Sequence, residues 1–221
     1  MSAIQNNISQ MLQVLPKDVV LVAVSKTKPE EDIMQAYDAG QRVFGENYIQ
    51  ELRDKYEHLP KDIEWHMIGH LQSNKVKYIA PFVQLIHGVD SEKLFEEINK
   101  RGVQNNRKIP VLLQIYIAEE ESKFGFDENE LHDLLSNLAV KNQKGIIING
   151  LMGMGSFTDN ESQLHHEFSY LRQIFDQVKS KYFARSSEFQ TLSMGMSGDY
   201  KIAIECGSNM VRIGSAIFGR R

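Results

Sequence analysis

Short apolar runs alternate with longer segments of helical period along the whole chain. Eight of these runs are typical of buried strands, because each is short, apolar or rich in β-branched residues and bounded by turn residues. They cover residues 19–25, 42–46, 63–69, 84–89, 109–118, 145–154, 190–194 and 209–219. Each run precedes a helix-like segment or the end of the sequence, which predicts a parallel sheet. Eight such units favour an α/β fold closed as a (β/α)8 TIM barrel, and a doubly wound sheet is the alternative.

The segments between the runs carry the marks of helices. Residues 91–102 begin at Ser91, a capping residue, and stop at Gly102. Residues 159–182 space their apolar side chains three or four positions apart, which predicts one buried helix face with Leu164, Phe168, Leu171 and Phe175. No Pro/Ser-rich or low-complexity segment divides the chain, so we expect a single barrel domain over residues 1–221.

The composition argues against several classes of protein. The 42% apolar content supports a sizeable core, and the net charge of −4 gives no electrostatic reason to bind nucleic acid or an anionic membrane. The lone Cys206 fits a reducing compartment. Residues 1–16 lack the basic start and continuous apolar core of a secretory signal, and the longest apolar run is too short to cross a bilayer. We therefore expect a cytoplasmic protein.

The first strand-like run, "VVLVAVS", is followed directly by Lys26. In parallel barrels the catalytic mouth is built from the C-terminal ends of the strands. Lys26 is therefore either a surface lysine entering a polar loop or a partly desolvated amine at the mouth. Burial would lower its pKa and leave a nucleophile able to form a Schiff base. Lys28 is a rival in the same loop, although it directly precedes Pro29 and lies farther from the strand.

The last two predicted strands end in small and hydroxylated residues. The seventh runs into Ser197 and Gly198, and the eighth into Gly214 and Ser215. Phosphate sites in these barrels commonly use these two loops, where backbone N–H groups can approach an anion. Ordinary turn and cap chemistry is the alternative for each loop. Combined with Lys26 on the first strand, the two loops predict a phosphorylated ligand that is held covalently.

Arg212 interrupts the apolar run "MVRIG". A buried guanidinium needs a partner, which is either a structural ion pair or a ligand atom that accepts hydrogen bonds. Asn47 either caps the helix that follows it or lines the mouth. His66 and His70 are four residues apart, but no carboxylate pattern completes a metal site, so we expect no bound metal. His165 and His166 read as exposed residues of a helix.

Seven stretches of the chain closely resemble one family, the pyridoxal 5′-phosphate homeostasis proteins, which are related to the N-terminal barrel of alanine racemase. They are "AVSKTKP", "FGENYIQE", "WHMIGHLQSNKVK", "ESKFGF", "GLMGMG", "LSMGMSGDYKIAI" and "VRIGSAIFG". The resemblance implies a fold-type III barrel with pyridoxal phosphate as its cofactor. It implies a Schiff base on Lys26, a phosphate site at Ser197 with Gly214 and Ser215, and Arg212 facing the pyridine nitrogen. It also implies Asn47 on the cofactor face and Lys123 in the loop after the fifth strand.

The resemblance implies a protein that buffers, carries or regulates intracellular pyridoxal phosphate and exchanges it with apo-enzymes. The printed sequence ends soon after the eighth run, so we expect no second β-rich domain and no opposing base, which disfavours a true racemase and favours a monomer. A small amino-acid racemase is the runner-up. A Schiff-base aldolase that acts on a sugar phosphate without a cofactor is the third hypothesis.

Overall fold

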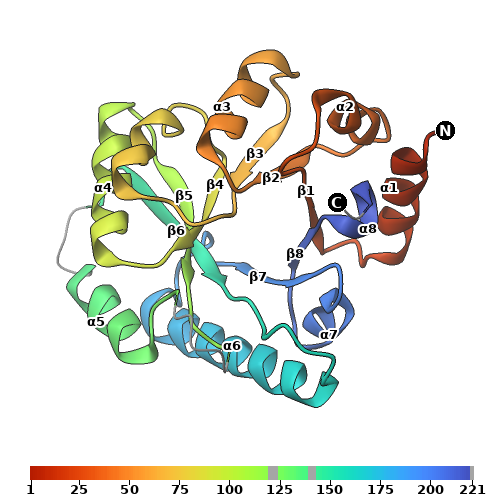
Figure 1. Ribbon diagram of the computed structural model, residues 1–221. Coiled ribbons are helices and arrows are strands. Elements are labelled where there is room, and N and C mark those ends of the chain that lie inside the picture. Colours follow the sequence, from red (N-terminus) through yellow and green to blue (C-terminus); the bar gives the residue numbers. More distant parts are fainter. Residues whose placement is uncertain (119–123, 139–142, 220–221) are drawn as a thin grey trace.

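The computed structural model describes residues 1–118, 124–138 and 143–219 of the chain and contains a closed barrel of parallel strands (Figure 1). The strands follow one another around the barrel in sequence order, and β1 closes it by pairing with β8. The predicted (β/α)8 barrel is therefore confirmed, and the doubly wound sheet is excluded. The strands are β1 (Val20–Val24), β2 (Val43–Glu46), β3 (Glu64–Met67), β4 (Leu85–Val89), β5 (Ile109–Gln114), β6 (Ile146–Met152), β7 (Thr191–Met196) and β8 (Met210–Ile213).

Helices surround the barrel (Figure 1). They are α1 (Ala3–Val14), α2 (Glu30–Asp38), α3 (Ile49–His58), the 3₁₀ helix η1 (Ser73–Tyr78), α4 (Glu92–Gln104), α5 (Glu128–Leu138), α6 (Glu161–Tyr182), α7 (Tyr200–Glu205) and α8 (Ser215–Phe218). The first and last helices lie side by side, because Nδ2 of Asn7 in α1 donates to the carbonyl of Ile217 in α8 at 2.9 Å. No helix in the described ranges combines the length and apolar character that a membrane span requires.

The apolar core has two parts. The larger part fills the space between strands and helices and includes the predicted face of α6, whose Leu164, Phe168, Leu171 and Phe175 are all buried. The smaller part lies inside the barrel and contains Val22, Leu85, Leu112, Met152 and Met210. Burial of this apolar surface is the main source of stability for the fold.

The barrel interior changes from apolar to polar toward the C-terminal strand ends. Side chains alternate along a strand with a period of two, so the residue two positions after an interior residue also points inward. Two positions after Leu85, Leu112 and Met210 come His87, Gln114 and Arg212, all of them buried. A polar layer therefore lies directly beneath the mouth of the barrel.

Several predicted boundaries were wrong at the ends of elements. The fifth run was predicted to reach residue 118, but β5 ends at Gln114, and residues 215–218 of the eighth run form α8 instead of strand. The seventh run was predicted to end at residue 194, whereas β7 continues to Met196. Gly102 does not stop α4, which continues to Gln104; it packs so closely on Gly145 that a Cβ at Gly102 would lie 1.9 Å from the Gly145 carbonyl oxygen.

Candidate functional site

A cavity of about 1020 Å³ opens at the C-terminal ends of the strands. All six residues proposed from the sequence as cofactor ligands line it, and they come from the ends of β1, β2, β7 and β8: Lys26, Asn47, Ser197, Arg212, Gly214 and Ser215. Gly198 lines it as well, and a Cβ added there would meet nothing within 4 Å. The structure thus brings together residues that are up to 189 positions apart in the sequence.

The two lysines of the β1–α2 loop differ in their contacts. Lys28 lines the cavity, but its Nζ donates to the carbonyl of Phe218 at the end of α8, 2.9 Å away. Lys26 is half-buried and donates no hydrogen bond to any residue in the described part of the chain. The amine of Lys26 is therefore free to react with a ligand, whereas that of Lys28 holds the chain end against the mouth.

The backbone around Lys26 is held from both sides by α3. Thr27 has φ of 64°, in the left-handed region that a β-branched residue rarely adopts. Its N–H donates to a carboxylate oxygen of Glu51 at 2.7 Å, while Nζ of Lys55 donates to the Ser25 carbonyl at 2.9 Å. These contacts fix the peptide groups before and after Lys26 and stabilise an otherwise strained turn.

Beneath this turn lies a buried ion pair. Nζ of Lys55 is 2.8 Å from Oε1 of Glu46, which also accepts the Ser25 hydroxyl at 2.6 Å. Burial raises the pKa of Glu46, and the contacts with Lys55 and Ser25 oppose that shift. The other carboxylate oxygen of Glu46 has no partner among the described residues. The Glu46 carboxylate therefore depends on Lys55 and Ser25 to be stable in its ionised form.

The β7 and β8 loops converge on the Ser197 hydroxyl. Its Oγ accepts the N–H of Gly214 at 3.2 Å and that of Ala216 at 3.4 Å. Gly195, with φ of 96°, lets the chain turn at the end of β7, and Asp199 accepts the Met196 N–H at 2.5 Å. Two backbone donors and a hydroxyl thus gather at the cavity wall, an arrangement that suits an anion.

Arg212 lies in the polar layer and is 4% exposed. Nη1 donates to the carbonyl and hydroxyl of Ser193 at 3.0 and 2.7 Å, and Nη2 donates to the Gly153 carbonyl at 3.0 Å. Burial lowers the pKa of Arg212 to about 10, so it is cationic at neutral pH. A guanidinium has five N–H groups. The three acceptors therefore leave donors that can face the cavity.

A hydrogen-bonded chain continues from Arg212 into the barrel. Since arginine can only donate, the Ser193 hydroxyl accepts from Arg212, and it also forms a hydrogen bond with Nδ1 of His87, 3.2 Å away. Nε2 of His87 in turn forms a hydrogen bond with Nδ1 of His66 at 3.1 Å. Burial lowers the pKa of His66 to about 3 and that of His87 well below its usual range, so both rings are neutral. This chain fixes the position of Arg212.

The loop after β6 forms another wall of the cavity. Glu167 of α6 is buried and accepts both the N–H and the hydroxyl of Ser156, at 2.7 and 2.6 Å. Met154 and Phe157 of this loop line the cavity and are largely exposed. Glu167 therefore orders the loop from below while apolar side chains remain at the mouth.

The histidines singled out in the sequence do not line this cavity. His66 is in the barrel interior, and the exposed His70 pairs with Asp90 at 3.1 Å. His165 on α6 lies 3.5 Å from Glu205. No cluster of metal-binding side chains occurs in the described ranges. Lys123 falls outside the described residues.

Sequence reasoning missed Ser193, His87, Glu51 and Glu167. Ser193 and His87 belong to apolar runs, and a polar residue within such a run was the available signal. Glu51 and Glu167 lie on helices, where a carboxylate looks like an exposed residue until its partner is known.

The barrel and the site at its mouth correspond to one class of domain. The family model "Alanine racemase, N-terminal domain" matches residues 1–221, so the chain belongs to this family.

The comparison with individual proteins is more specific. The chain is 40% identical over 227 residues to the pyridoxal phosphate homeostasis protein of Pasteurella multocida (strain Pm70), covering 100% of this chain and 96% of that protein. It is 40% identical over 213 residues to the protein of the same name from Escherichia coli (strain K12), covering 93% and 87%. PipY of Synechococcus elongatus PCC7942, solved with PLP bound, superposes with a TM-score of 0.88 at 31% identity, covering 98% and 100%. The chain is thus a member of the pyridoxal phosphate homeostasis proteins, as its motifs predicted.

Proposed function

We propose that this chain binds pyridoxal phosphate in the barrel-mouth cavity and buffers or carries it inside the cell. The observation that carries the proposal is the amine of Lys26, which has no hydrogen-bond partner among the described residues and shares one cavity with Ser197 and the Arg212 guanidinium. The names of the relatives and the PLP bound to PipY support it.

The residues present fit the parts of this cofactor. Lys26 would supply the amine that holds the aldehyde covalently, with loss of water. Ser197 and the Gly214–Ser215 turn would hold the phosphate, Arg212 would donate to the pyridine nitrogen, and Asn47 would line the cofactor face, since all of them line the cavity. When bound, the cofactor supplies an electrophilic carbonyl carbon and an electron-accepting ring.

Arg212 favours storage over catalysis. Being cationic and a donor only, it would leave the nitrogen of a bound pyridine ring unprotonated, and such a ring would accept electrons poorly and support carbanion chemistry weakly. The chain Arg212–Ser193–His87–His66 holds the guanidinium in this role. We further propose that the protein acts as a cytoplasmic monomer and exchanges the cofactor with apo-enzymes that depend on it.

Turnover of amino acids tests this proposal against the racemase alternative. The protein loaded with pyridoxal phosphate is incubated with each L-amino acid, and the enantiomer composition is followed over hours by chiral chromatography. We expect no more turnover than free pyridoxal phosphate gives at the same concentration. Steady multiple turnovers above that level would favour the racemase. Delivery of the cofactor to an apo-enzyme would support the carrier role.

The anion site gives a second prediction. Ser197→Ala removes the hydroxyl that links the β7 loop to Gly214 and Ala216. Hydrogen bonds to a charged group contribute about 1.5–3 kcal/mol, so binding of pyridoxal phosphate should weaken about tenfold or more. Binding of pyridoxal, which lacks the phosphate, should change little. Absorbance titration with both ligands measures this difference, and an equal loss for both would show that Ser197 does not bind the phosphate.

A further inference from the structure

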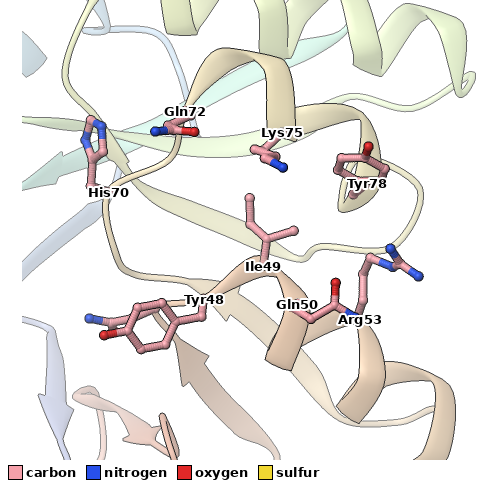
Figure 2. Close-up of a pocket in the computed structure, with 9 residues that line it drawn as sticks. Tyr48, Ile49, Gln50, Arg53, His70, Gln72, Lys75 and Tyr78 are labelled. Carbon is pink, nitrogen blue, oxygen red and sulfur yellow. The ribbon is translucent and has the colours of Figure 1, made fainter.

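A second cavity, of about 430 Å³, lies between α3 and η1 (Figure 2). Nine residues from the segments 47–53 and 70–78 line it. Seven of them belong to the stretches "FGENYIQE" and "WHMIGHLQSNKVK", and Arg53 and Tyr78 follow shortly after those stretches. Of the residues that line this cavity, the cofactor proposal uses only Asn47, which lines both cavities. The volume falls within the range of small-molecule sites, about 300–1,000 Å³.

Two cations are held at this cavity. The guanidinium carbon of Arg53 and Nζ of Lys75 lie 5.6 and 5.7 Å from the ring centroid of Tyr78. Arg53 forms an exposed ion pair with Glu57 at 3.9 Å, and exposed pairs of this kind contribute little to stability. Lys75 forms no ion pair with any described residue. None of the described residues that line the cavity is acidic. This charge distribution favours an anion.

The other walls suit a flat, partly apolar group. Tyr48 and Tyr78 line the cavity and are 54% and 39% exposed. Figure 2 shows Ile49 and Lys75 facing each other from α3 and η1, with Tyr48 and Tyr78 at opposite ends of the view. Exposed tyrosine rings offer stacking surfaces, and Ile49 offers an apolar one.

We propose that this cavity binds a small phosphate monoester that carries a planar aromatic ring. Arg53 and Lys75 would contact the phosphate, whose two charges match two cations better than a single carboxylate would. A tyrosine ring would stack on the aromatic group. A nucleoside monophosphate and a phosphorylated vitamin B6 form share this chemistry, and this site does not depend on the cofactor function proposed for the barrel mouth.

Two probes and one matched control test the site. AMP and pyridoxine 5′-phosphate, which has no aldehyde to react with a lysine, are titrated into the full chain by calorimetry, with inorganic phosphate in parallel. Arg53→Met and Lys75→Met should each weaken binding about tenfold through loss of a charge-assisted contact. Lys77→Met removes the same charge from the same η1 helix, 4.9 Å from the Tyr78 ring but outside the cavity wall, and should have little effect.

The outcomes distinguish a nucleotide from a phosphorylated vitamin B6 form as the ligand. Binding of AMP that depends on Lys75 would identify a nucleotide site. Binding of pyridoxine 5′-phosphate that depends on Lys75 and survives Ser197→Ala would identify a second vitamin site. The proposal is overturned if neither ester binds saturably, if Lys77→Met weakens binding as much as Lys75→Met, or if inorganic phosphate binds as tightly as both esters. Failure of these tests leaves reaction at Lys26 unaffected, so the two proposals are judged separately.

Discussion

Lys26→Ala is expected to abolish covalent attachment of pyridoxal phosphate at the end of β1. The wild-type chain, treated with pyridoxal phosphate and then with borohydride, should carry the reduced adduct on the peptide that contains Lys26. The reason is geometric: the Lys26 amine lines the cavity without a hydrogen-bond acceptor in the described ranges, whereas the Lys28 amine is bound to the Phe218 carbonyl. Peptide mass mapping after reduction measures the attachment site directly.

Lys28→Ala is the matched control for this experiment, because it removes an amine from the same loop and the same cavity. The adduct on Lys26 should persist in this variant. Labelling confined to Lys28 or Lys123 in the wild-type chain, with Lys26 unmodified, would contradict the assignment. Adduct formation on Lys26 in the wild type and its loss in the variant would establish the Schiff-base residue.

The site residues could be grouped from the sequence because they all lie near the C-terminal ends of parallel strands in one barrel. Residues that end parallel strands meet at one mouth, so Lys26, Ser197 and Arg212 could be grouped from the strand pattern alone. The pattern of apolar residues did not predict where some of the strands end. In "RIGSAIFG" the apolar residues continue beyond Gly214, and only hydrogen bonding distinguishes the short helix α8 from further strand.

The supporting contacts could not be predicted, because they join residues through the closed barrel. His87 and Ser193 are 106 positions apart, and they meet only because β4 and β7 point these side chains into the same interior layer. The contacts that hold the Lys26 turn depend on which face of α3 packs against β2 and β3, because Glu51 and Lys55 of α3 must reach the turn. A single sequence records neither the register of the strands nor the rotation of the helix.

Lys55→Met is expected to lower the free energy of unfolding by about 3–5 kcal/mol, the usual cost of removing one partner from a buried ion pair. The side chain of Glu46 is 0% exposed and that of Lys55 is 7% exposed, so the remaining carboxylate would stay buried without its cation. The double variant Glu46→Gln/Lys55→Met should recover part of the loss. Urea unfolding measures these differences, with Arg172→Met as the control, since its exposed pair with Asp176 should contribute at most about 1 kcal/mol.

The pH dependence of this loss provides a separate test of its cause. Burial already raises the pKa of Glu46, and removal of Lys55 should raise it further in the folded state. Glu46 would then keep its proton in the folded state at pH values where the unfolded chain has lost it, so the stability of the variant should fall as pH rises above the unfolded pKa of about 4.3. The deficit of Lys55→Met relative to the wild type should therefore be larger at neutral pH than near pH 4. A deficit that is the same at both pH values would show that lost packing of the lysine stem, and not the unpaired carboxylate, destabilises the barrel.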